Sequence, residues 1–173
     1  MDRRFFNKLG ATLINRGPLC GIVRGTAYSS LFGDAPGMAP EQAQHADLIV
    51  VWGNNVTVSN LHLARVIKAA RGRGGRLIVI DPKRTKIAEQ ADLHLQVQPG
   101  TDVVLGLALA AELERQGAFD QAFIDQWVTG LDAYMAEARQ YTPEQVTEIC
   151  GLSRTQFDDM VSWYRAAERV AVS

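Results

Sequence analysis

The sequence predicts an α/β fold, with a Rossmann-like open, mainly parallel sheet, helices on both faces, and a C-terminal helical segment. An unbroken apolar run from Leu48 to Trp52 is rich in β-branched residues and stops at Gly53, which is typical of a strand buried on both faces. A helical pattern and a second apolar run, Leu77 to Ile80, complete one βαβ unit. A third short strand, Leu93 to Val97, precedes turn residues and another helix.

The pattern divides the chain into three parts. Residues 1–40 are expected to be the incomplete N-terminal segment of a larger domain, with helical spacing over 3–15. Residues 41–118 are expected to form a dinucleotide-binding α/β domain. Residues 119–173 are expected to continue this domain with helices and to end in a truncated strand, which favours a piece of a longer polypeptide.

Helix-start residues punctuate the second and third parts. Thr57 or Ser59 is expected to cap the helix after the first strand. Asp120 is expected to cap a later helix, and capping boxes begin at Thr142 and Ser153. Buried structural roles are expected for three further residues on helices, namely Trp127, Cys150 and Trp163.

Composition limits the classes of partner. The 173 residues are 47% hydrophobic and 21% charged, as in an ordinary globular domain. A net charge of -1 gives no electrostatic reason to expect nucleic acid. No apolar run approaches the roughly 18 residues that span a bilayer, so membrane insertion is not expected. Two cysteines form no disulfide framework, which favours the cytoplasm, with the periplasm as the alternative if a signal lies upstream.

Polar, turn-forming residues follow all three predicted strands. Gly53-Asn54-Asn55 follow the first, Asp81-Pro82 the second, and Gly100-Thr101-Asp102 the third. In open α/β sheets, ligands bind outside the carboxyl ends of the strands. A nucleotide diphosphate needs small residues for close backbone approach, amide donors at a helix start and a carboxylate for a ribose or base. Thr85 is a further candidate donor to a phosphate.

Each of these residues also has a purely structural interpretation. Gly53 can end a strand, and Asp81 can make a turn. Thr101 or Asp102 can cap the following helix for about 1 kcal/mol, and Thr85 can cap a short helix toward residue 88. Capping alone does not require three strand ends to converge, so their succession favours a ligand site.

Four motifs, in order, resemble the signature of the molybdopterin oxidoreductases of the dimethyl sulfoxide reductase family. They are Trp52-Gly53-Asn54-Asn55, Ile80-Asp81-Pro82-Lys83-Arg84-Thr85, Ala91-Asp92-Leu93-His94-Leu95 and Gln98-Pro99-Gly100-Thr101-Asp102. The later segments Tyr141-Thr142-Pro143-Glu144 and Cys150-Gly151-Leu152 resemble the family's helical continuation. The resemblance implies part of a molybdenum-dependent oxidoreductase that binds the guanosine diphosphate portion of a molybdopterin guanine dinucleotide.

By this resemblance, Gly53 and Asn54 would meet the diphosphate, while Asp81 and Asp102 would hold the ribose or guanine. Lys83 stands where an arginine is common. The full expected cofactor-binding set is Gly53, Asn54, Asn55, Asp81, Pro82, Thr85, Gly100, Thr101 and Asp102.

The resemblance also implies the cofactor and partners of the whole enzyme. The cofactor would be molybdenum bis-molybdopterin guanine dinucleotide, which carries oxygen-atom or hydride-type transfer, and an iron-sulfur cluster would belong to a preceding part of the polypeptide. The expected partners are the rest of the same polypeptide, a small-molecule substrate and an electron-transfer subunit. The chain alone is expected to be inactive.

Cys20 is the candidate catalytic residue and molybdenum ligand. Its thiolate would be a soft ligand, and it precedes Gly53 by 33 residues, close to where related enzymes carry the metal-binding Cys, selenocysteine or Ser. A small buried hydrophobic residue is the alternative. Formate dehydrogenases have His after that residue, whereas Gly21 follows here, so formate is not assigned as the substrate.

Two other classes of protein share parts of this pattern. One is a non-catalytic relative that keeps the fold as a scaffold in a respiratory complex subunit; the strand-end acids and Cys20 argue against it. The other is the central domain of a thiamine-diphosphate enzyme. That domain fits the first strand but not the Asp-Pro and Pro-Gly-Thr-Asp strand ends.

Overall fold

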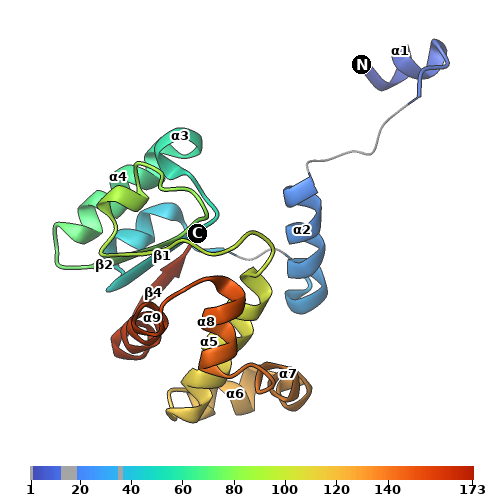
Figure 1. Ribbon diagram of the computed structural model, residues 1–173. Helices are drawn as coiled ribbons and strands as arrows, with labels where there is room; N and C mark the ends of the chain where they lie inside the picture. Colours follow the sequence, from blue (N-terminus) through green and yellow to red (C-terminus); the bar gives the residue numbers. More distant parts are fainter. Residues whose placement is uncertain (1, 13–18, 35–36) are drawn as a thin grey trace. The chain divides into compact units, whose positions relative to one another are not determined.

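The computed structural model describes residues 2–12, 19–34 and 37–173 and divides into two compact units, Met1–Met38 and Ala39–Ser173 (Figure 1). The first unit contains α1 (Asp2–Lys8) and α2 (Leu19–Phe32). The predicted helix over 3–15 ends early because Gly10 adopts the left-handed region at φ 66°. The sequence-based domain boundaries stay predictions.

The second unit is built on a four-stranded sheet with strand order β3-β2-β1-β4, in which every pair is parallel (Figure 1). Its strands are β1 (Leu48–Trp52), β2 (Arg76–Ile80), β3 (Leu93–Leu95) and β4 (Val170–Val172). The prediction of a mainly parallel sheet is confirmed, although β3 ends two residues before Val97. Leu48 of the central strand pairs with Arg76 on one side and Val170 on the other.

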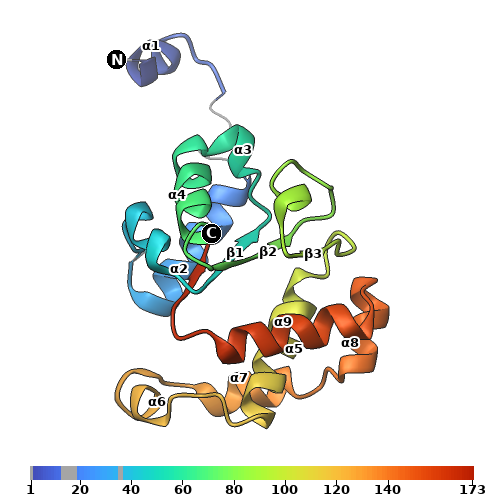
Figure 2. The ribbon, with the colours of Figure 1, turned by 90° about the vertical axis from the view of Figure 1, so that its left-hand side faces the viewer.

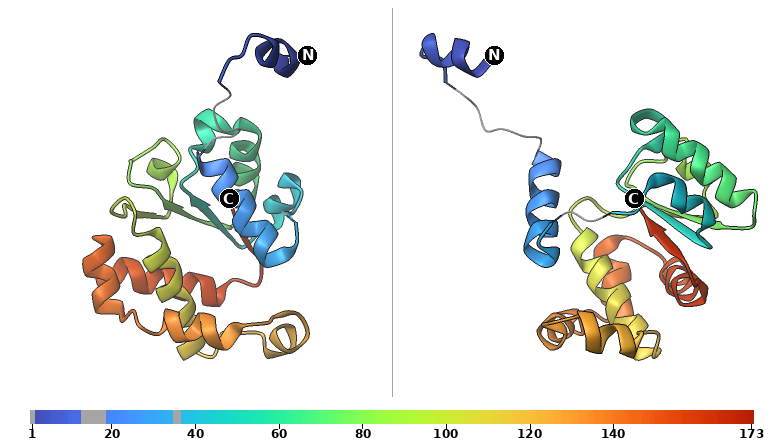
Figure 3. Two further views of the ribbon diagram at one scale, coloured as in Figure 1. Left: turned by 90° about the vertical axis from the view of Figure 1, so that its right-hand side faces the viewer. Right: turned by 180° about the vertical axis from the view of Figure 1, so that it is seen from behind.

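Helices cover both faces of the sheet, as predicted (Figures 2 and 3). Ile49 and Val51 of β1 pack in one core with η1 (Pro40–His45) and α4 (Leu61–Arg71). Leu48 and Val50 pack in the other core, with α5 (Asp102–Arg115), α8 (Pro143–Cys150) and α9 (Arg154–Ala166). The strand is therefore buried on both sides because alternate side chains enter different cores.

The later helices begin largely where the sequence predicts. Asp120 caps α6 (Gln121–Trp127), and capping boxes form at Thr142 and Ser153. The predicted cap of α4 is wrong: the chain first forms α3 (Val56–Ser59), and Asn60 then accepts a hydrogen bond from the Leu63 amide. Within the described residues, no helix is long and apolar enough to cross a membrane.

Trp127 does not belong to a core, contrary to the prediction. Its side chain is 68% exposed, and α6 has no buried residue. The helix precedes α7 (Leu131–Ala138), which buries Met135 and Ala138 instead. Trp163 is partly buried against the core and lies under the guanidinium of Arg76, 4.6 Å from the ring centre.

A salt bridge fastens the start of β4 to the start of β1. Asp47 Oδ1 accepts from Arg169 Nη2 at 2.9 Å, and its Oδ2 accepts from the Arg169 backbone amide at 3.0 Å. The hydrogen bond from the Arg169 side chain, above all, holds the pKa of Asp47 below its usual value. The ionised carboxylate therefore helps to hold the last strand against the central one.

The substitution Phe157→Ala should lower the free energy of unfolding by about 3–5 kcal/mol, because Phe157 of α9 is 0% exposed in the core beneath the sheet. Urea unfolding followed by circular dichroism measures the change. Phe123→Ala is the matched control, since this phenylalanine is 57% exposed and its loss should change the free energy by less than about 0.5 kcal/mol. Equal losses in the two variants would contradict the assignment of the core.

The substitution Asp47→Asn should destabilise the chain more at about pH 7 than at about pH 2.5. Folding lowers the pKa of Asp47 below 3.8, so its stabilisation is complete above that value and is lost as the pH falls through the lower, folded-state pKa. Urea unfolding at both pH values measures the difference. Asp159→Asn is the control, because Asp159 makes no ion pair among the described residues, and it should show a smaller difference.

Candidate functional site

The carboxyl ends of β1, β2 and β3 emerge at one edge of the sheet, here called the carboxyl edge, because the strands are parallel. Gly53 follows β1, Asp81 follows β2, and residues 96–101 connect β3 to α5. The segments predicted to form a site are therefore placed along the same edge.

A side-chain hydrogen bond joins two of these segments directly. Trp52 Nε1, at the last residue of β1, donates to Oδ1 of Asp102, the first residue of α5, at 2.7 Å. Asp102 is exposed, and its negative charge is favourable in the first helical turn. Thr101 stands at the N-cap but does not cap the helix, because its hydroxyl donates to the Gln98 carbonyl at 2.7 Å.

Asp81 is held by its own turn. Its side chain is only 9% exposed, and Oδ1 accepts from the Lys83 amide at 2.8 Å. The backbone carbonyl of Asp81 lies 2.9 Å from Nε2 of His94 on β3. The side chain of Gln96 supports the residue after Asp81, because its Nε2 donates to the Pro82 carbonyl at 2.8 Å. The turn-forming role considered for Asp81 is thus present, and β3 supports it.

Gly53 and Gly100 leave open space beside the backbone. Their φ angles are +64° and +89°, a region that favours glycine, and a Cβ placed on either would meet no other atom within 4 Å. The Gly53 amide already donates to the Ile80 carbonyl at 2.8 Å, so it extends the sheet pairing. No other described residue therefore stands against these two glycines on the side where a Cβ would lie.

The two asparagines after Gly53 have different partners. Asn54 Nδ2 donates to the Ser173 hydroxyl at 2.9 Å, which ties the end of β1 to the residue after β4. Asn55 Oδ1 accepts from the Thr57 hydroxyl at 2.8 Å within its own turn. The contact with Ser173 could not be predicted from the sequence, because the side of β1 on which β4 would pair was not predicted.

The C-terminal end of α8 supports the segment that leads into α5. The Gln98 amide donates to the Cys150 carbonyl at 2.9 Å, and the Cys150 thiol lies 3.7 Å from the Thr101 carbonyl. A Cβ on Gly151 would lie 3.1 Å from the Gln98 side chain. Burial raises the pKa of the Cys150 thiol, and its predicted structural role is confirmed.

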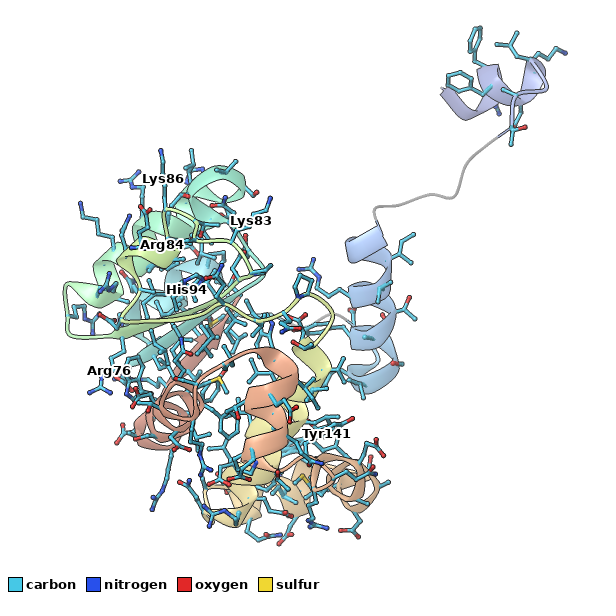
Figure 4. All side chains as sticks on the ribbon, viewed as in Figure 1. Arg76, Lys83, Arg84, Lys86, His94 and Tyr141 are labelled. Atoms are coloured by element: carbon cyan, nitrogen blue, oxygen red, sulfur yellow. The ribbon has the colours of Figure 1, made fainter. Side chains whose placement is uncertain are left out.

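Three exposed cations, Lys83, Arg84 and Lys86, lie on the segment after β2 (Figure 4). Thr85, between them, accepts from the Ala88 amide at 3.3 Å, so the capping role considered for it is present. From the sequence, Lys83 was interpreted only as a departure from the family pattern. The run of basic residues directly after a strand end was the available signal for positive charge at this edge.

Cys20 lies on the backbone of α2, but its side chain is outside the described residues. It belongs to the first unit, Met1–Met38, and not to the unit that contains the sheet. Its role as a molybdenum ligand therefore stays a prediction. Among the residues that the structure describes, no group of three or more His, Cys, Asp or Glu side chains gathers as a metal site.

A parallel sheet with crossover helices on both faces and glycine-containing turns at its carboxyl edge defines the class: a Rossmann-like α/β domain. The family follows from comparison with known proteins. The family model described as molybdopterin oxidoreductase matches residues 3–173, and the chain belongs to this family.

Relatives in other organisms agree with this assignment. The chain is 32% identical to the F420-dependent formate dehydrogenase subunit alpha of Methanocaldococcus jannaschii, over 85% of the chain and 22% of the relative. It is 32% identical to the nitrate reductase of a Synechocystis strain, over 88% of the chain and 22% of the relative. The structure of acetylene hydratase from Pelobacter acetylenicus superposes with a TM-score of 0.66 and 25% identity, over 77% of this chain and 20% of that one. The chain thus spans about a fifth of these proteins.

In a Cys20→Ser variant, which leaves Cys150 as the only thiol, the folded chain should resist alkylation by iodoacetamide at about pH 8. The reason is that Cys150 is 0% exposed and burial raises its thiol pKa, so little thiolate is available. Mass spectrometry measures the modification, and the same variant unfolded in urea is the positive control. Rapid alkylation of the folded variant would show that α8 does not close over the segment before α5.

Proposed function

We propose that the carboxyl edge binds the guanosine diphosphate portion of a molybdopterin guanine dinucleotide, as part of a larger molybdenum-dependent oxidoreductase. The observation that carries the proposal is the hydrogen bond from Trp52 to Asp102, which joins two predicted ligand segments at one edge. Membership of the molybdopterin oxidoreductase family implies a molybdenum-molybdopterin cofactor, and the strand-end residues are the part of this chain suited to its nucleotide.

The chemistry of the edge fits a diphosphate. The open backbone at Gly53 and Gly100 allows phosphate oxygens to approach. The first turn of α5 offers amide donors and the positive end of the helix dipole, in a helix of 14 residues. The cations after β2, including Lys83 and Arg84, add positive charge that the diphosphate would partly neutralise.

Asp102 fits the nucleoside better than Asp81 does. The Watson–Crick edge of guanine carries N–H donors, and an ionised carboxylate is a strong acceptor for them. Each carboxylate already accepts one hydrogen bond, Asp102 from the Trp52 indole and Asp81 from the Lys83 amide, but Asp102 is exposed whereas Asp81 is nearly buried. Asp102 therefore takes the base or ribose in this proposal. Asp81 shapes the turn after β2 and offers its second oxygen to a ribose hydroxyl.

When bound, the molybdenum centre supplies the oxygen-atom or hydride-type transfer. The residues of this chain bind and orient the nucleotide end of the cofactor. Cys20 as a molybdenum ligand, the bis-dinucleotide form, the iron-sulfur cluster, the substrate and the electron-transfer subunit belong to the whole protein. They remain part of the proposal.

Titration of the isotopically labelled chain with GDP, followed by amide NMR shifts, tests the site. Gly53, Gly100 and Asp102 should shift together, and Asp102→Asn should weaken GDP binding by about 10-fold or more, since hydrogen bonds to charged groups contribute about 1.5–3 kcal/mol.

Asp132→Asn is the matched control, because Asp132 is an exposed residue of α7, and this variant should bind GDP as the unmodified chain does. Shifts confined to another surface, or no shifts with GDP, would refute the proposed function.

A further inference from the structure

We infer that Trp52 is a positioning residue that fixes the carboxylate of Asp102 for nucleotide recognition. The inference rests on the proposed function and extends it to a residue that touches Asp102. In the sequence, Trp52 is the last residue of a predicted strand and the first residue of a family motif. Its indole N–H, however, is the polar group that reaches Asp102 Oδ1, 50 residues further along the chain.

The donor is held from both ends. The backbone of Trp52 is in the central strand, where it pairs with Ile80, and its amide donates to the Ser173 carbonyl at 2.8 Å. Its ring is partly buried against the core formed with α5, α8 and α9. The indole N–H is therefore directed by the pairing of the strand and by the packing of the ring.

The indole lies along the first turn of α5. Nε1 contacts Asp102, and the far edge of the ring, at Cη2, would lie 3.9 Å from a Cβ placed on Gly106. Residues four apart occupy the same face of a helix, so the ring lies across that face from Asp102 to Gly106. Because residue 106 is a glycine, no side chain keeps the indole away from this face of the helix.

The hydrogen bond divides the roles of the two carboxylate oxygens. Oδ1 accepts from the indole, while no hydrogen bond from the described part of the chain reaches Oδ2. An exposed aspartate without such a partner rotates among several side-chain conformations, and a ligand must then select one of them. With Oδ1 fixed, Oδ2 is presented in a constant position at the start of α5, so less side-chain entropy is lost on binding.

A double-mutant cycle for GDP affinity tests this role. Trp52→Phe removes the N–H and should weaken GDP binding by about 3- to 10-fold, the range expected for losing one pre-ordered side chain. In the Asp102→Ala background the same substitution should have less than about a 2-fold effect, because the group through which Trp52 acts is gone. Equal effects in the two backgrounds would overturn the inference.

Two further measurements separate positioning from packing. Replacement of Trp52 by 3-benzothienylalanine keeps the bicyclic ring but removes the N–H, so it should weaken GDP binding as Trp52→Phe does. If this isostere binds GDP like the unmodified chain, packing explains the effect and the inference fails. Trp163→Phe is the matched control, since Trp163 is also partly buried against the same core and should leave GDP affinity unchanged.

The two proposals fail in different ways. If the unmodified chain shows no GDP-dependent shifts, the proposed function is refuted, and the role of Trp52 falls with it. If GDP binds and Asp102→Ala weakens it, but Trp52 acts additively, only the positioning role is refuted. A change in the Trp52 indole N–H resonance on Asp102→Ala, with Trp163 unaffected, is expected if the hydrogen bond forms in solution.

Discussion

The parallel alignment of β1 with both neighbouring strands is the constraint on which the rest of the second unit depends. Parallel strands cannot be joined by tight hairpins, so each connection must cross a face of the sheet, and helices cover both faces. The same alignment brings every carboxyl end to one edge. Residues from distant parts of the sequence, such as Trp52 and Asp102, therefore meet there.

Much of the fold could be predicted from the sequence because its signals are local. The apolar, β-branched run from Leu48 to Trp52 became β1 with the predicted bounds, and the capping boxes at Thr142 and Ser153 formed as expected. The wrong predictions concern a helix cap and a buried residue, both of which depend on neighbouring parts of the structure. The cap of α4 is Asn60 because a separate turn precedes it, and Trp127 is exposed because no described core reaches α6.

The candidate site was predicted as a set of segments but not as a set of contacts. Asp81 and Asp102 have the same side chain and similar positions after strands, so the sequence could not rank them. The structure separates them by burial and by partner: the Lys83 amide satisfies one oxygen of Asp81, while Asp102 is exposed beside the indole of Trp52. Side-chain direction across 50 residues depends on tertiary packing, which no local pattern contains.

The close approach of Gly151 to Gln98 links the helical continuation to the carboxyl edge. Gly151 combines a left-handed φ of 71° with a place where an added carbon would press on the Gln98 side chain. A larger residue there would disturb the end of α8 and the strand-to-helix connection of the sheet at once. Residues 98 and 151, though 53 residues apart in the chain, are therefore linked by a direct steric constraint, since any side chain at residue 151 requires the side chain of residue 98 to move.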